Sequence, residues 1–256
     1  MNDLVVSGAK PLYLSLALII EEGLDADTLD RILGSIRGAA RKASVQVVTG
    51  DTKVVRQGQG DKIYINTSGI GRSVGRPAVR KIRPGDKVIL TGPLGDHSLA
   101  VMLARGDFGL KSPARSDCAP LLFLLPLWKA GALWMRDVTR GGLATVLAEL
   151  SERLPYPVLV EENLIPLSAA VRGATEILGI DPLFMACEGK AVVIAPAKAA
   201  ARMLARIRRH PLGRKAAVIG EVQDRVGKPG ELLLRTASGG LRLLEPLTSE
   251  LLPRIC

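Results

Sequence analysis

Residues 25–43 read DADTLDRILGSIRGAARKA, and two strand-like runs follow them, SVQVVTG at 44–50 and KIYINTSGIG at 62–71. In the first stretch, apolar residues recur at helical spacing behind acidic residues suited to capping a helix N-terminus. These residues are Leu29, Ile32, Leu33, Ile36, Ala39 and Ala40. We therefore expect an amphipathic helix that lies on a β-sheet.

A second series of elements begins at IRPGDKVILTG, residues 82–92, where a turn signal precedes a new strand. Helical patterns then alternate with short runs rich in Val, Ile and Leu. The expected helices span 97–107, 141–154 and 197–210, and the expected strands span 190–196, 217–222, 231–236 and 241–246. This pattern predicts an α/β fold with some antiparallel pairing, an α+β feature.

A domain boundary is expected near Arg83, at the start of this second series. It gives an N-terminal domain at 1–83 and a C-terminal α/β domain at 84–245. Residues 246–256 show weak periodicity and contain Pro253 close to the end, so they are expected to form a flexible tail.

Composition narrows the class of protein. The 256 residues are 47% hydrophobic, which is enough to fill a core. The net charge of +10 comes from cations spread among acids, and aromatic residues are only 3% of the chain, so nucleic-acid binding is not expected. The densest basic cluster, at 206–210, is expected at a helix end.

Targeting and redox signals are also informative. The N-terminus has no basic region, and the longest apolar runs are too short to span a bilayer, so neither export nor a membrane role is expected. The three cysteines, Cys118, Cys187 and Cys256, form no CxxC pair and no metal-ligand spacing. A reducing cytoplasm fits them best.

Two stretches could bind phosphate. In TGDTK, residues 49–53, Asp51 could hold Mg²⁺ and Lys53 could meet an anionic oxygen, although GDT is also an ordinary turn. In DVTRGGL, residues 137–143, two glycines precede a helix and would expose backbone N–H groups to an anion. A plain capped loop is an equally good interpretation of the second stretch.

Other polar residues have weaker patterns. Asn2 and Asp3 could supply oxygen ligands to Mg²⁺, and Glu188 in CEGK could act as a general base, although such a Glu is more often a surface residue. Cys118 and Cys187 lie among apolar residues and are expected to be inert packing cysteines.

Cys256 is the last residue of the chain, and no residue after it can pack over its thiol. Prenylation through a CaaX box is excluded because the fourth residue from the end is Pro253. The thiol is then either incidental or a swinging carrier that reaches an active site.

Taken together, the motifs of the chain resemble those of the HypE hydrogenase maturation factors, within the PurM-like superfamily of ATP-dependent enzymes. The terminal PRIC is the most specific of them. The motifs are NDLVVSGAKPLYLSLALIIEEG (2–23), VVTGDTKVV (47–55), INTSGIG (65–71), ILTGPLGDHSLAVMLARGD (89–107), SDCAPL (116–121), RDVTRGGLATVLAEL (136–150), EGKAVVIAP (188–196), HPLGRKAAVIGEV (210–222) and PRIC (253–256).

The resemblance implies a PurM-like two-domain fold and an ATP-dependent carbamoyl dehydratase. A HypF carbamoyltransferase would load a carbamoyl group onto Cys256, and ATP would convert it to a thiocyanate. The cyanide would pass to iron on a HypC–HypD complex.

By the same resemblance, Asn2, Asp3, Asp51 and Thr52 would bind ATP, with Mg²⁺ on Asp3 and Asp51. Lys53 would polarise the carboxamide oxygen, Glu188 would take a proton, and the chain would form a homodimer.

The chain also departs from the family pattern. It has CEGK where NEGK is usual, DVTRGG for DPTRGG and GDHS for GDHG. Family members carry a Gly-rich, acid-containing segment before the NDL motif, so we expect an N-terminally shortened chain with an incomplete N-terminal domain. Two alternatives stay open: a non-catalytic carrier or scaffold that binds HypF or HypC–HypD, and another PurM-like synthetase or kinase.

Overall fold

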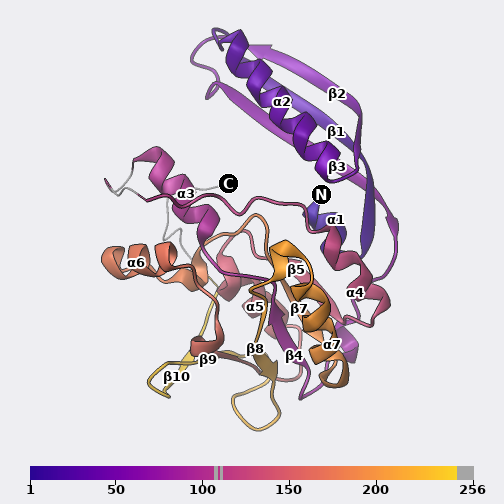
Figure 1. Cartoon of the computed structure of the whole chain (residues 1–256), viewed down its shortest axis with the longest axis vertical. Helices are drawn as coiled ribbons and strands as arrows, with labels where there is room; N and C mark the ends of the chain where they lie inside the picture. The colour runs from indigo at the N-terminus through magenta and orange to yellow at the C-terminus, as the bar shows by residue number, and fades with distance from the viewer. Residues whose placement is uncertain (107–108, 110–111, 247–256) are drawn as a thin grey trace.

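A three-stranded sheet forms the first unit of the structure, a computed structural model that describes residues 1–106, 109 and 112–246. Its strands are β1 (Ala9–Glu21), β2 (Gln46–Val55) and β3 (Ile63–Ser73), in the order β2-β1-β3. β2 runs parallel to β1 and β3 antiparallel to it. The parallel pair is joined by α2 (Ala26–Lys42), which lies along the sheet (Figure 1).

The two faces of this small sheet differ because side chains alternate along a strand. Leu14 and Leu18 of β1 are buried on the face that α2 covers, where Leu14 packs with Ala40 and Ala43 at the end of that helix. Tyr13 and Ile19 lie on the other face and are each 43% exposed. We call this second surface the open face of the small sheet.

A seven-stranded sheet forms the second unit, in the order β10-β9-β6-β8-β4-β7-β5. All its neighbours pair antiparallel except β6 and β9. The strands are β4 (Lys87–Leu90), β5 (Trp134–Asp137), β6 (Val158–Glu161), β7 (Ala191–Ala195), β8 (Ala217–Val222), β9 (Leu232–Arg235) and β10 (Leu241–Leu243).

Helices pack on both faces of the large sheet, so most residues of its central strands β4, β7 and β8 are buried. On β4, Val88 and Leu90 pack with α5 (Gly142–Ser151), whereas Ile89 packs with α7 (Ala197–Arg208). A strand buried on both faces needs a continuous apolar run, which Val88–Leu90 of β4 and AVVIA of β7 provide.

The remaining helices and turns complete the second unit. They are α3 (Asp96–Arg105), α4 (Leu125–Lys129), α6 (Ala169–Leu178) and the 3₁₀ turns Val79–Lys81, Leu122–Leu124, Glu162–Leu164, Pro182–Phe184 and Pro211–Gly213. In the part of the chain that the structure describes, no helix is long and apolar enough to cross a membrane.

The N-terminal helix α1 (Asn2–Val6) lies where the two units meet (Figure 1). It contacts β1 and β3 of the small sheet and β5 of the large one. Val5 and Val6 are buried in the core beneath α7, and the Trp128 indole N–H donates to the Val5 oxygen at 2.9 Å. The second unit therefore holds the very start of the chain.

Two glycines let the chain cross itself at this junction. Gly8 has a φ of 91°, and a Cβ there would collide with the backbone oxygen of Gly75. A Cβ at Gly75 would in turn collide with the Trp128 side chain. The entry to β1 and the exit from β3 can therefore approach each other closely.

The predicted mixed α/β fold class is confirmed, and the predicted helix at 25–43 is α2. The strand prediction at 217–222 matches β8 at both ends. Three strands, β1, β5 and β6, were not predicted. The predicted tail, residues 246–256, lies outside the described residues except for Pro246.

Candidate functional site

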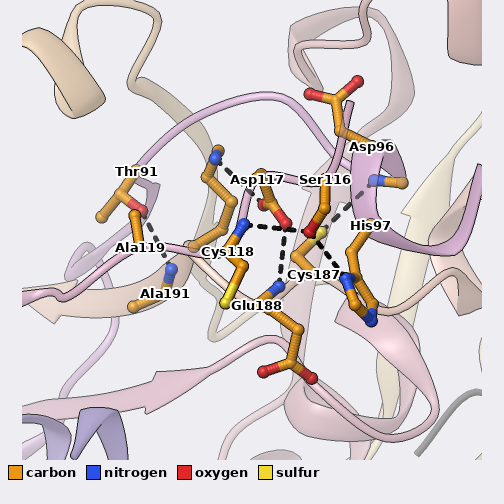
Figure 2. A network of polar contacts seen from close by, with 12 residues as sticks. Thr91, Asp96, His97, Ser116, Asp117, Cys118, Ala119, Cys187, Glu188 and Ala191 are labelled. Carbon is orange, nitrogen blue, oxygen red and sulfur yellow. Dashed lines mark hydrogen bonds and ion pairs between the residues drawn. The ribbon is translucent and has the colours of Figure 1, made fainter. Parts of the chain in front are cut away.

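The loop that carries Glu188 leads into β7 and is crossed by residues 112–121, which we call the crossing segment (Figure 2). The loop and the crossing segment approach each other closely, because a Cβ on Gly189 would collide with the backbone oxygen of Asp117. Only glycine fits at position 189 without displacing one of the two segments.

Asp117 joins the crossing segment to this loop through both of its carboxylate oxygens. Oδ1 accepts a hydrogen bond from the Glu188 backbone N–H at 2.9 Å, and Oδ2 forms an ion pair with Lys190 Nζ at 3.0 Å. The Asp117 and Lys190 side chains are only 4% and 8% exposed. Because the charges cancel and both oxygens are used, this buried pair leaves no net charge in the interior.

Asn2 holds the other side of the same loop. Its side-chain nitrogen donates to the Glu188 oxygen at 3.2 Å and to the Ala119 oxygen at 3.0 Å, and its side-chain oxygen accepts from the Leu121 N–H at 3.0 Å. The amide thus binds α1 to the crossing segment and to Glu188. Its predicted role toward ATP stays a prediction.

Asp137, at the end of β5, lies near two of the predicted site residues. Burial raises the pKa of its carboxyl, and the negative charges of Asp3 and Glu188 raise it further. Asp137 is therefore close enough to Asp3 and to Glu188 for their charges to act on it. No group of three or more His, Cys, Asp or Glu side chains that could hold a metal ion occurs among the described residues.

The remaining predicted residues, Asp51, Thr52 and Lys53, lie on β2 of the small sheet and are exposed. Asp51 pairs with Ala17 and Lys53 pairs with Ile19, so both side chains project from the open face. Thr52 projects from the opposite face, and its backbone N–H donates to Asp51 Oδ1 at 2.8 Å. The TGDTK stretch is thus part of a strand, and it is not a turn.

The predicted residues therefore fall into two groups. Asn2, Asp3 and Glu188 gather where α1 meets the second unit, whereas Asp51, Thr52 and Lys53 lie on the small sheet. Cys256 lies outside the described residues. The sequence analysis missed Asp117 and Lys190, which lie in the quoted motifs SDCAPL and EGKAVVIAP, because no spacing rule connects positions 73 residues apart.

The cysteine predictions are half right. Cys187 is buried, and burial raises the pKa of its thiol to about 12, so it is the expected inert packing cysteine. Cys118 is exposed on the crossing segment, and the prediction that it packs in the core is wrong. Partial burial and the charges of Glu188 and Asp117 nevertheless raise the pKa of its thiol as well.

The 137–143 stretch runs from the end of β5 into α5, as predicted. Gly141 and Gly142 both have positive φ, and a Cβ on Gly142 would collide with the backbone of Leu183. The two glycines thus have a steric reason that is independent of any phosphate.

Comparison with known families assigns both parts of the chain. The family described as AIR synthase related protein, N-terminal domain, matches residues 1–73. The family described as AIR synthase related protein, C-terminal domain, matches residues 83–231. The first match covers the small sheet and the second covers β4 to β8 of the large sheet, and together they confirm the predicted PurM-like fold.

Individual relatives match over almost the whole chain. The carbamoyl dehydratase HypE of Rhodobacter capsulatus is 44% identical over all of this chain and 76% of its own length. A crystal structure of HypE in complex with ATP matches with a TM-score of 0.93 and 41% identity, over 100% of this chain and 78% of that one. A HypE–HypF complex matches with a TM-score of 0.88 and 39% identity, over 96% and 81%.

The raised pKa of Asp137 predicts how stability depends on pH. The folded chain holds this proton more tightly than the unfolded chain, so this carboxyl's contribution to stability falls as the pH rises through the raised pKa. Asp137→Asn removes that ionisation. In buffer without nucleotide or Mg²⁺, we expect the variant to melt at a higher temperature than the wild type at pH 7, with the difference shrinking towards pH 4.

Differential scanning calorimetry across this pH range measures the effect. Asp30→Asn, an exposed carboxylate on α2, is the matched control and should leave the melting temperature unchanged at every pH. A variant at Asp137 that is less stable than the wild type at pH 7 would contradict the electrostatic account.

Proposed function

The chain belongs to the HypE family of carbamoyl dehydratases, and from this premise we propose that it dehydrates a carbamoyl group carried on the Cys256 thiol to a thiocyanate, using ATP. The observation that carries the proposal is the 44% identity to a carbamoyl dehydratase over the full length of this chain. The product would supply cyanide to the iron of a [NiFe]-hydrogenase.

The chemistry determines what the site must do. The thiocarbamate on Cys256 has to lose its oxygen and two N–H protons while the carbon–nitrogen bond becomes a triple bond. ATP supplies a phosphoryl group that turns the oxygen into a good leaving group, so the oxygen departs with phosphate and no oxidant is needed. The protein must bind the oxygen, accept a proton and exclude water.

We assign these tasks as the family resemblance does. The Lys53 ammonium would polarise the carboxamide oxygen, and the Glu188 carboxylate would take a proton from the nitrogen. The surroundings of Glu188 support this role: both its N–H and its C=O are held by hydrogen bonds, and its carboxylate points away from the Asp117 carboxylate (Figure 2). A base with a fixed backbone can be aimed at a substrate.

For the nucleotide, we propose Asn2, Asp3, Asp51 and Thr52, with Mg²⁺ on Asp3 and Asp51. Mg²⁺ is usually held by one or two carboxylates together with phosphate oxygens, so two carboxylates are a suitable protein share. The raised pKa of Asp137 beside Asp3 supports a cation there, because a positive charge would relieve the repulsion between the carboxylates.

Cys118 is a poor carrier on electrostatic grounds. The thiolate is the nucleophilic form, and the raised pKa of Cys118 keeps that thiol protonated. We propose that a HypF carbamoyltransferase loads Cys256 and that a HypC–HypD complex receives the cyanide. A structural relative has been crystallised as a HypE–HypF complex. The two described cysteines are free, which fits a reducing compartment such as the cytoplasm.

We also propose that the chain forms a homodimer through the open face of the small sheet. Four large residues, Tyr13, Ile19, Tyr64 and Ile70, project from that face and are 43% to 69% exposed. A second copy would cover this apolar surface, which is otherwise costly to leave in water.

Carbamoyl loading tests the carrier. Incubation with a HypF protein, carbamoyl phosphate and ATP should add one carbamoyl group to the wild type, detected by intact-protein mass spectrometry. Cys118→Ala and Cys187→Ala should load normally, and Cys256→Ala should not load. Later loss of one water from the loaded wild-type chain would establish dehydration, whereas an adduct on Cys256→Ala would remove Cys256 from the mechanism.

Nucleotide binding tests Asp51. Asp51→Asn retains an oxygen that can accept from the Thr52 N–H, and it removes only the charge. We expect Mg-ATP affinity to fall on the order of 10-fold in calorimetric titration, because charge-assisted contacts are worth ~1.5–3 kcal/mol. Carbamoyl loading should be unchanged, since loading needs only the tail. Asp30→Asn is again the control, and equal affinity in the Asp51 variant would place the phosphates elsewhere.

Oligomeric state tests the open face. Ile70→Arg places a charge within the proposed interface and should convert a dimer to a monomer in light scattering. The matched control is Ile177→Arg, on α6, where the side chain is 73% exposed and far along the chain from the small sheet. A wild-type monomer, or a dimer that survives Ile70→Arg, would contradict this interface.

A further inference from the structure

Asp117 and Lys190 form the most deeply buried ion pair among the described residues, yet neither has a place in the proposed chemistry. Buried charges are expensive, and an apolar pair of similar size would often be at least as stable. Because stability alone does not explain a buried ion pair, we looked for a role of this pair in the function of the site. Asp117 accepts a hydrogen bond from the Glu188 N–H, and Lys190 lies two residues after Glu188 in the sequence, so the position of the pair indicates what that role is.

We propose that Asp117 is a positioning residue that aims Glu188 at its substrate, with Lys190 as the countercharge that allows Asp117 to be buried. This inference rests on the proposed role of Glu188 as the base. It adds a residue from a distant part of the chain to the machinery that the reaction needs.

The hydrogen bonds around Glu188 support this inference. Its N–H is held by Asp117 Oδ1 at 2.9 Å, and its C=O accepts from Asn2 at 3.2 Å and from the Ala119 N–H at 3.5 Å. The peptide groups on both sides of the Glu188 Cα are thus tied to the crossing segment and α1. Fixing both groups fixes the direction in which the side chain leaves the backbone.

The ion pair makes Asp117 an unusually firm anchor. Lys190 Nζ holds Oδ2 at 3.0 Å, so the carboxylate cannot rotate away from the Glu188 N–H without breaking a buried charge pair. Lys190 itself is confined, because its side-chain carbons lie against Gly92, where a Cβ would collide with them. The neighbouring residues are held too: the Cys187 N–H donates to the Val138 oxygen at 2.7 Å.

The crossing segment is itself braced. Ser116 and Cys118 flank Asp117 in the sequence, and the Ser116 hydroxyl oxygen accepts from the Cys118 N–H at 3.1 Å (Figure 2). The same hydroxyl oxygen lies 2.8 Å from His97 Nδ1. Asp117 is therefore presented by a segment anchored on α3. Small displacements of a reacting group cost up to ~100-fold in rate, so this rigidity has catalytic value.

Two double variants separate positioning from stability. Asp117→Asn with Lys190→Met removes both charges and keeps an oxygen acceptor for the Glu188 N–H. Asp117→Ala with Lys190→Met also removes both charges and takes the acceptor away. Neither leaves a buried charge unpaired, so the comparison isolates one hydrogen bond. Glu149→Gln, which breaks the half-exposed pair with Arg136, is the control for losing an ion pair as such.

Two measurements are made on the full chain. The first is amide hydrogen exchange of the peptide around Glu188, which needs no activity. The second is single-turnover dehydration of the carbamoylated chain at saturating ATP. For the Ala/Met variant we expect faster exchange and a rate lower by on the order of 10- to 100-fold, with the half-saturating ATP concentration little changed. The Asn/Met variant should recover most of the rate and protection, and Glu149→Gln should match the wild type.

Gly189→Ala is an independent second variant, since its methyl group would push the crossing segment away without touching any charge. It should reproduce the rate loss of the Ala/Met variant. Normal exchange in the Ala/Met variant, or faster exchange with a wild-type rate, would overturn the positioning role. A loaded wild-type chain that never loses water would instead overturn the proposed function, while the exchange result would still decide whether Asp117 holds Glu188.

Discussion

The attachment of α1 to the second unit is the constraint on which the rest of the structure depends. Val5 and Val6 are buried beneath α7, the Trp128 indole holds the Val5 oxygen, and the Asn2 amide makes three hydrogen bonds to the segments around Glu188. β1 starts directly after this helix, so the position of the small sheet follows from that of α1. A single short helix thus connects the sheet that carries Asp51 and Lys53 to the loop that carries Glu188.

The two units are built for different purposes. The large sheet is covered on both faces by helices, and most residues of its central strands are buried, which makes it a rigid support. The small sheet is covered by α2 on one face only. Its open face presents two charged side chains, Asp51 and Lys53, and a set of large apolar side chains. Exposing these apolar side chains to water is unfavourable, so a surface of this kind is suited to bind a substrate, a nucleotide or a second subunit.

Charge is placed sparingly around Glu188. Asp117 and Lys190 neutralise each other, and both are almost completely buried. Asp3 and Asp137 are not neutralised in the same way. The negative charge of Asp3, together with burial, raises the pKa of Asp137. One carboxylate near the proposed base is therefore structural, whereas the repulsion between Asp3 and Asp137 is one that the Mg²⁺ proposed on Asp3 would relieve.

The sequence by itself determined the fold class and most of the helices. Periodicity located α2, α5 and α7 because amphipathic faces are recorded locally. The resemblance of its motifs to a family predicted Glu188 and Lys53 as site residues, and these roles stay predictions. The sequence could not reveal the open face, which depends on the register between β1, β2 and β3, nor the exposure of Cys118. The link between Asp117 and Lys190 was equally hidden, since it joins positions 73 residues apart and exists only once the crossing segment lies over Gly189. Local patterns fix local structure, whereas contacts between distant segments are decided by packing, and packing exists only in the folded chain.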